Sequence, residues 1–209
     1  SYISSFWATR FEARGFDASR TAITLSTTLS TLGLLIYLTL SLPISRSVGM
    51  AYPLFALAAI QVPLFYTTIN FDALAYARRP QATGYSFTVY EVSKVALAVI
   101  LVDQLRMSLA GAILAVALAQ SAEAVTIYLY ALRGRLRGSF NSSYARRWLK
   151  AFWLPIIGGG HTISGLWFFM GIDSLIVSTI TSSSIPVAMF RAAYVLADIA
   201  SYSGLIALA

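Results

Sequence analysis

The sequence predicts an all-α integral membrane protein, a polytopic bundle of about six transmembrane helices. Of its 209 residues, 58% are hydrophobic and only 11% are charged, whereas soluble domains average about 25% charged residues. The mean hydropathy is +0.73. The basic residues cluster between apolar runs, as they do in polytopic membrane proteins. A chain so poor in charge could not cover a water-facing surface.

Six stretches are long and apolar enough to span a membrane, which takes about 20 residues. Pro63 should kink the second stretch, because it removes a backbone donor and its ring clashes with the preceding turn. The fifth stretch is too long for one straight span, and Pro155 and glycines 158–160 should break it. Its start should lie along the membrane interface, with Trp148 and Trp153 at headgroup level. The stretches are 21–42, about 50–77, 85–102, 108–132, part of 148–180, and 185–209.

Basic-rich and basic-poor loops alternate along the chain, which gives its orientation. The positive-inside rule places residues 1–20, 78–84 and 133–150 on the cytoplasmic side of the cell membrane. Because the basic residues follow this pattern, the net charge of +7 indicates a membrane topology and not a nucleic-acid partner. The longest basic segment contains Arg133, Arg135, Arg137, Arg146, Arg147 and Lys150.

Three parts are predicted along the chain. Residues 1–132 should hold four transmembrane helices, residues 133–150 a basic cytoplasmic loop, and residues 151–209 two further helices. The chain begins without methionine and ends inside an apolar run, so we expect it to be an internal portion of a longer protein.

The sequence carries no recognisable motif for catalysis or for metal binding. It has no cysteine and a single histidine, His161, so we expect no transition-metal site and no cofactor. No nucleophile stands beside a base in a known motif, and no glycine loop resembles a phosphate-binding loop. We therefore expect the protein not to be an enzyme.

Seven ionisable groups fall within the predicted spans, and they are the candidate functional residues. A charge in mid-membrane costs at least ~3 kcal/mol, so these groups need partners or a watery cavity. Glu91 and Lys94 lie three residues apart on one helix face and can pair. They could form a local salt bridge whose lysine reaches to the cytoplasmic surface, or a pair that faces a cavity. The seven are Asp72, Glu91, Lys94, Glu123, Asp173, Arg191 and Asp198.

Asp173 and Arg191 should lie at a similar depth on the two helices of a hairpin. They could form a structural clamp, or Arg191 could be a cationic site for an anionic ligand. Asp198 lies about two turns from Arg191 on a similar face.

Glu123 stands alone in an alanine-rich helix, where a protonated, neutral carboxyl is the simplest interpretation. Asp72 lies near the cytoplasmic end of its helix and is expected to pair with Arg78. The deep tyrosines Tyr90 and Tyr194 could line a cavity, although packing also explains them.

Several segments resemble a known transporter family. FFMGIDSLIVSTITSSSIPVAMFRAAYVLADI (168–199) resembles the seventh and eighth helices of the polysaccharide-biosynthesis flippases, the Wzx-like branch of the multidrug/oligosaccharidyl-lipid/polysaccharide exporter superfamily. TRFEARGFDASRTAITLSTTLS (9–30) resembles the basic loop into the third helix, and ARRPQATGYSFTVYEVSKVALAVILV (77–102) the cytoplasmic turn into the fifth. Residues 133–150 resemble the link between the two lobes.

The resemblance implies helices three to eight of a two-lobed transporter with 12–14 helices. Such a protein flips a lipid-linked oligosaccharide across the membrane by alternating access, for cell-surface polysaccharide synthesis. Its partners would be the lipid-linked oligosaccharide, membrane lipids and proteins of glycan synthesis. By charge and position, the candidate substrate-binding residues are Arg191, Lys94 and Tyr194. The candidate ion-coupling residues are Asp173, Asp198, Glu91 and Glu123.

Two other functions stay open. A cation-coupled exporter of drugs or small molecules with the same fold would have an acidic or aromatic cavity, and five intramembrane acids against two bases agree with that. A structural subunit of a larger membrane complex would instead turn these charges toward partner helices.

Overall fold

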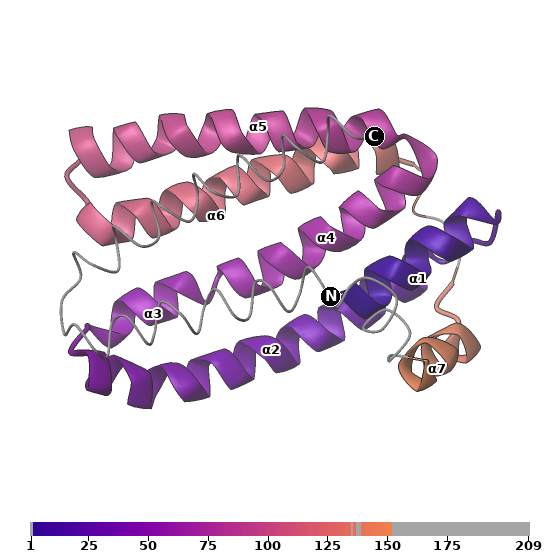
Figure 1. Ribbon diagram of the computed structural model, residues 1–209, viewed down its shortest axis with the longest axis horizontal. Helices are drawn as coiled ribbons and strands as arrows, with labels where there is room; N and C mark the ends of the chain where they lie inside the picture. Colours follow the sequence, from indigo (N-terminus) through magenta and orange to yellow (C-terminus); the bar gives the residue numbers. More distant parts are fainter. Residues whose placement is uncertain (1, 135, 137–138, 152–209) are drawn as a thin grey trace, which may run out of the picture. The chain divides into compact units, whose positions relative to one another are not determined.

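The computed structural model describes residues 2–134, 136 and 139–151, and every regular element among them is helical (Figure 1). The predicted fifth and sixth spans lie outside the described residues. The elements are α1 (Tyr2–Ala13), α2 (Ser19–Val48), α3 (Tyr52–Ala58), α4 (Gln61–Arg78), α5 (Pro80–Ala98), the π-helical turn η1 (Val99–Gln104), α6 (Ser108–Ile127), the π-helical turn η2 (Tyr128–Leu132) and α7 (Ser142–Lys150).

Four helical segments are long and apolar enough to cross a membrane, which agrees with the predicted class of protein. They are Ser19–Arg46, Tyr52–Arg78, Pro80–Gln104 and Ser108–Leu132. The last has the bounds expected from sequence. The first continues beyond the expected end at residue 42, because α2 passes through Pro43 and ends only at Gly49, whose φ of 69° is the left-handed conformation that glycine adopts easily.

The second span is interrupted where Pro63 was expected to kink it. The α-helix ends at Ala58 and begins again at Gln61. Pro63 has no N–H to donate to the carbonyl of Ala59, four residues earlier. That carbonyl instead accepts from Val62 N at 3.1 Å, so the chain passes through a short irregular turn before α4 starts.

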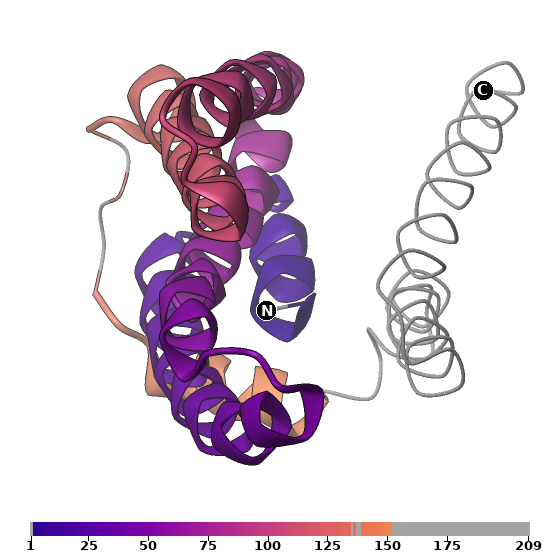
Figure 2. The ribbon, with the colours of Figure 1, turned by 90° about the vertical axis from the view of Figure 1, so that its left-hand side faces the viewer.

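Helix α4 lies at the centre of the described bundle. It contacts α1 and α2 on one side and α5 and α6 on the other, while α5 and α6 form the most extensive pair. Figures 1 and 2 show α2 on one side of α4 and the α5–α6 pair on the opposite side. Side chains from both neighbouring layers can therefore meet α4.

The α5–α6 pair packs through small residues. Helix α6 buries Gly111, Ala115 and Ala119, which recur every four residues and so lie on one face. A Cβ at Gly111 would lie 2.8 Å from the carbonyl oxygen of Leu101 and 2.9 Å from Cβ of Met107. The hairpin between α5 and α6 is thus closed tightly enough that only glycine fits at this position.

We therefore expect Gly111→Ala to destabilise the protein by about 1–3 kcal/mol, because the added methyl group would overlap backbone atoms that cannot move aside. The measurement is the free energy of unfolding in mixed micelles. Gly84→Ala in α5 is the matched control: its Cβ would meet nothing within 4 Å, so it should be neutral or stabilising by up to ~1 kcal/mol. Equal effects of the two substitutions would contradict the close contact.

The first residues form a helix and not the loop expected from sequence. In α1, Ser4, Ser5 and Ala8 are buried, and α1 packs against α4 and α2. The Thr9 hydroxyl donates to the carbonyl of Ala73 in α4 at 3.2 Å. Small side chains let the two backbones approach closely enough for that bond, so tertiary packing stabilises a short helix of low hydrophobicity.

The three segments predicted to be cytoplasmic gather at one end of the bundle. Arg78, in the segment 78–84, forms an ion pair with Glu12, in the segment 1–20, with a closest distance of 2.7 Å. The backbone N–H of Asn141 donates to the Thr21 hydroxyl at 2.9 Å, while the Asn141 carboxamide accepts from Ser143 N and caps α7. Tertiary contacts thus bring together the same segments that the charge pattern assigns to one side.

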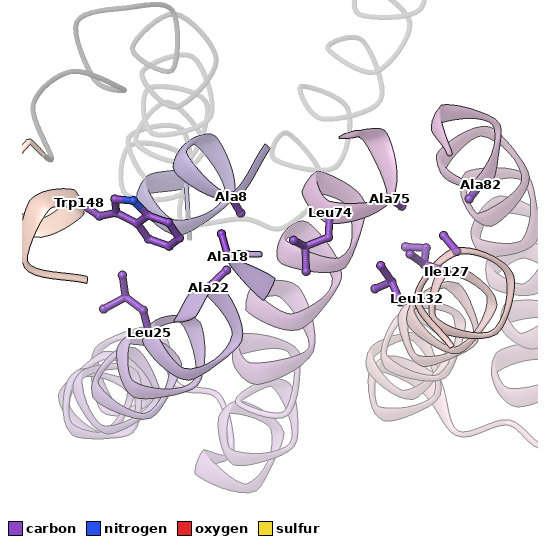
Figure 3. Close-up of a cluster of buried hydrophobic side chains, with 11 residues drawn as sticks. Ala8, Ala18, Ala22, Leu25, Leu74, Ala75, Ala82, Ile127, Leu132 and Trp148 are labelled. Carbon is purple, nitrogen blue, oxygen red and sulfur yellow. The ribbon is translucent and has the colours of Figure 1, made fainter. Parts of the chain in front are cut away.

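Trp148 is buried in protein, in a contact between helices that the sequence pattern did not predict. Its side chain is only 1% exposed, and its ring meets that of Phe11 edge-on at 5.6 Å. Figure 3 shows it reaching from α7 toward α1 and α2. Tyr144 of α7 also packs on Phe11, with the ring centroids 4.9 Å apart, so aromatic packing anchors the basic loop to the bundle. Trp153, the other tryptophan expected at headgroup level, lies outside the described residues.

Candidate functional site

Four ionisable side chains lie at successive depths within the spans, measured from the end where the basic segments gather. At 1.5 Å per residue, Asp72 is about 9 Å from the end of α4 at Arg78. Glu123 is about 14 Å from the end of η2 at Leu132. Glu91 and Lys94 are about 17 and 21 Å from the start of α5 at Pro80. The acids and the lysine thus reach from near the surface to about the middle of the membrane.

Glu91 and Lys94 form the ion pair that their spacing predicts. Lys94 Nζ lies 2.7 Å from Glu91 Oε2 and 2.8 Å from Glu91 Oε1. It also lies 4.6 Å from the centre of the Tyr90 ring, an arrangement that attracts a cation. Lys94 therefore does not extend toward the end of its span, because its ammonium group is held within the span by Glu91 and Tyr90.

The Glu91–Lys94 ion pair is partly exposed on the surface of the described helices. The Lys94 side chain is 32% exposed and that of Glu91 is 42% exposed. Contact with lipid hydrocarbon at this depth would be costly for both charges. This face of α5 must therefore meet water or other polar groups in the membrane.

Glu123 lies inside the bundle, on the buried face of α6. It is 8% exposed and lies on the buried small-residue face of α6, four residues after Ala119. Its helix packs against α4, which carries Asp72, and against α5, which carries Glu91 and Lys94. The other ionisable residues of the spans lie on neighbouring helices. The alanine-rich sequence around Glu123 therefore gives no indication of them.

Asp72 faces the α5 side of α4 and belongs to the same group. Its carboxyl interacts with the Thr83 hydroxyl, and the two atoms Asp72 Oδ1 and Thr83 Oγ1 are both buried without a hydrogen bond of good geometry among the described residues. Asp72 is thus a buried carboxyl with unfilled hydrogen-bonding capacity. The sequence analysis assigned it only a local ion pair, so its place in this group was missed.

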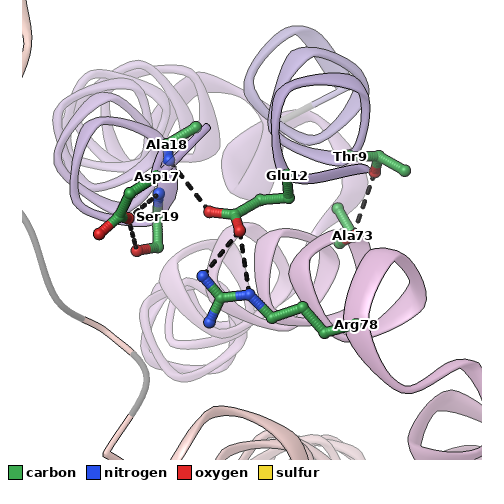
Figure 4. A network of polar contacts seen from close by, with 7 residues as sticks. All are labelled: Thr9, Glu12, Asp17, Ala18, Ser19, Ala73 and Arg78. Atoms are coloured by element: carbon green, nitrogen blue, oxygen red, sulfur yellow. Dashed lines mark hydrogen bonds and ion pairs between the residues drawn. The ribbon is translucent and has the colours of Figure 1, made fainter. Parts of the chain in front are cut away.

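Arg78 pairs with Glu12 and not with Asp72. Its Nε and Nη2 donate to Glu12 Oε2 at 3.0 and 2.7 Å, as Figure 4 shows. Residues six apart on a helix point about 120° away from each other, which explains why Asp72 does not reach Arg78. The α1 helix, unexpected from sequence, supplies the carboxylate instead.

The intramembrane group has more acids than bases. Among the described residues, the interior of the spans carries three carboxyls, Asp72, Glu91 and Glu123, and one ammonium, Lys94, and of these Glu91 and Lys94 are in contact. If all were ionised, two negative charges would be uncompensated in a medium of low dielectric constant. Carboxyls in such surroundings are candidates for binding a proton or a cation.

Metal-ligand geometry does not occur within the described residues, where no group of three or more His, Cys, Asp or Glu side chains is arranged to hold a metal ion. The candidates Asp173, Arg191, Tyr194 and Asp198, together with His161, lie outside the described residues. The described part of the site therefore consists of the four charged groups, Tyr90 and Thr83.

Comparison with protein-family models, curated proteins and solved structures finds no match for this chain. The fold defines its class: a helical membrane protein with at least four segments able to cross the bilayer. A predominantly acidic, partly exposed set of side chains inside the spans is the feature from which a more specific function can be argued.

Proposed function

We propose that the chain is part of a membrane transporter that flips a lipid-linked oligosaccharide by alternating access, driven by a cation gradient. The observation that carries the proposal is that the interior of the neighbouring spans carries three carboxyls, Asp72, Glu91 and Glu123, and one ammonium, Lys94, which is paired with Glu91. An intramembrane ionisable residue is a functional candidate by default. Here the carboxyls outnumber the one ammonium, so we infer that they take up and release a cation or a proton, as a coupling site must.

The substrate part of the proposal comes from the family resemblance. In this interpretation the lipid-linked substrate contributes a diphosphate, and a cation on a span face must accept it. Lys94 is the described candidate: its ammonium group is at mid-span and 32% exposed. The proposed orientation places residues 1–20, 78–84 and 133–150 in the cytoplasm, where the substrate would be collected.

The test is Glu123→Gln in the full-length protein. Glutamine keeps the size and much of the hydrogen bonding but cannot titrate, so gradient-driven translocation of lipid-linked oligosaccharide should fall by at least about tenfold, equivalent to about 1.4 kcal/mol. The folded amount in the membrane should stay normal. Translocation is measured in proteoliposomes under an imposed proton or sodium gradient and is normalised to folded protein.

Asp103→Asn is the matched control, because Asp103 is an exposed carboxyl in η1 near the other end of the span. It should leave translocation unchanged. Normal gradient-driven flipping by Glu123→Gln would refute the coupling role. A loss of folded protein without a loss of specific activity would assign Glu123 to structure.

A cation-coupled exporter of small molecules is the second candidate, and the excess of carboxyls favours it. An acidic group suits a lipophilic cation better than it suits a diphosphate. Proteoliposomes loaded with a lipophilic cation distinguish the two: export that Glu91→Gln abolishes, in a protein that does not flip the lipid-linked oligosaccharide, would establish the exporter.

A further inference from the structure

A pocket lies between α2, α4 and η2, near the end of the bundle where the basic segments gather. Its volume is about 510 Å³, within the range of about 300–1,000 Å³ typical of ligand pockets. It is separate from the acidic group, sharing none of its residues. The lining residues are Arg20, Ile23, Phe71, Tyr128, Gly134 and Leu136.

The pocket changes character with depth. Arg20 is the second residue of α2 and is exposed at the rim. Ile23 lies about one turn further in, and Phe71 lies about 10 Å from the end of α4 at Arg78. The rings of Phe71 and Tyr128 stack with their centroids 6.3 Å apart. A charged rim above an apolar, aromatic interior matches a molecule with an anionic head and a hydrocarbon tail.

The guanidinium group of Arg20 is available to an external anion. The nearest acids along the chain are committed elsewhere: Glu12 binds Arg78 and the backbone N–H of Ala18, and Asp17 accepts from the Ser19 hydroxyl at 2.7 Å. No carboxylate pairs with Arg20 among the described residues. A guanidinium can donate two parallel hydrogen bonds to phosphate oxygens and stays charged at any accessible pH.

We propose that this pocket binds an anionic phospholipid of the adjoining leaflet. Its phosphate would lie on Arg20 and one acyl chain against Ile23, Phe71 and Tyr128. The depth of the apolar lining favours a lipid over a soluble anion, because these side chains lie within the spans while Arg20 lies at headgroup level. The site does not depend on what the protein transports.

The test compares two lipids with identical acyl chains, phosphatidylglycerol and phosphatidylcholine, by native mass spectrometry of the full-length protein in detergent. The first phosphatidylglycerol should bind more tightly than the first phosphatidylcholine. Arg20→Gln should weaken phosphatidylglycerol binding by about tenfold and leave phosphatidylcholine binding little changed, because a charge-assisted phosphate contact is lost. The affinity of Arg20→Lys for phosphatidylglycerol should fall between those of the wild type and Arg20→Gln, since lysine keeps the charge but cannot donate two parallel hydrogen bonds as a guanidinium does.

Arg14→Gln is the matched control, an exposed arginine in the same end region that does not line the pocket. It should leave phosphatidylglycerol binding near the wild-type value. Ile23→Trp should fill the apolar part and weaken binding of both lipids. Because Arg20 is exposed, the Arg20 variants report on the site even if Ile23→Trp fails to fold.

Three results would overturn the proposal. Equal affinity for phosphatidylglycerol and phosphatidylcholine would show that the site does not recognise the negative charge of the headgroup. An equal loss in Arg14→Gln and Arg20→Gln would assign binding to the diffuse positive charge of this end. Displacement of phosphatidylglycerol by millimolar inorganic phosphate would show an anion site that does not use the apolar wall.

Discussion

Arg78→Gln should lower the free energy of unfolding by about 3–5 kcal/mol, the usual cost of removing one partner of a buried ion pair. The side chains of Arg78 and Glu12 are 17% and 6% exposed, and their closest atoms are 2.7 Å apart. Without Arg78, the Glu12 carboxylate would stay buried and uncompensated. Glu12 also accepts from the backbone N–H of Ala18 at 3.0 Å, so the same loss would weaken the turn that leads into α2.

The double variant Glu12→Gln/Arg78→Gln separates this interpretation from a general loss of packing. Two neutral amides leave no buried charge, so much of the lost stability should return. If the double variant is as unstable as the sum of the two single variants, the residues do not interact. The free energies of unfolding of the two single variants and the double variant are measured in mixed micelles.

Arg79→Gln is the matched control for the same experiment. Arg79 is the next residue and is exposed, with a hydrogen bond to Tyr130 O. An exposed contact of this kind contributes about 0–1 kcal/mol. A similar loss in Arg79→Gln and Arg78→Gln would contradict the special role of the buried pair.

The described spans were predictable because one physical requirement determines them. Lipid offers no hydrogen bonds, so a spanning segment must be helical and apolar over its whole length. The run 108–132 shows this directly, since its predicted and observed bounds coincide. The break before α4 was also predictable, because proline lacks the donor that the helix needs at Pro63.

Contacts between helices were predictable only where both partners lie on one helix. The Glu91–Lys94 pair follows from its three-residue spacing. The partner of Arg78 and the neighbours of Glu123 lie on other helices, and no local pattern identifies them. The helical state of α1 was missed for the same reason: Ser4 and Ala8 gain from burial against neighbouring helices, which periodicity alone does not show.

Trp148→Ala should lower the free energy of unfolding by about 3–5 kcal/mol, because it leaves a large cavity among α7, α1 and α2. Trp148 is 1% exposed and belongs to the main buried cluster with Ala8, Ala22 and Leu25. Helix α7 has only nine residues, and isolated helices of this length are not stable in water. The tryptophan is therefore the main attachment of α7 to the bundle.

Proteolysis gives a local readout of that attachment. Arg146 and Arg147 are exposed trypsin sites on α7, protected while the helix is docked. In Trp148→Ala, cleavage at these residues should be much faster than in the parent protein, whereas cleavage at Arg106, in the α5–α6 connection, should be unchanged. Leu149→Ala is the control, because Leu149 is adjacent but 46% exposed and should change neither stability nor cleavage appreciably.

Trp148→Phe tests whether ring packing or the indole nitrogen holds the helix. The Trp148 Nε1 is buried without a hydrogen-bond partner among the described residues. Removing this unpaired donor should therefore cost no stability, and the relief of its desolvation penalty should offset part of the cost of the smaller ring. Phenylalanine keeps an aromatic contact with Phe11, whose ring lies 5.6 Å away. We therefore expect at most about half of the alanine effect. If Trp148→Phe releases α7 as completely as Trp148→Ala does, the indole nitrogen has a partner in the membrane, and the docking depends on that bond.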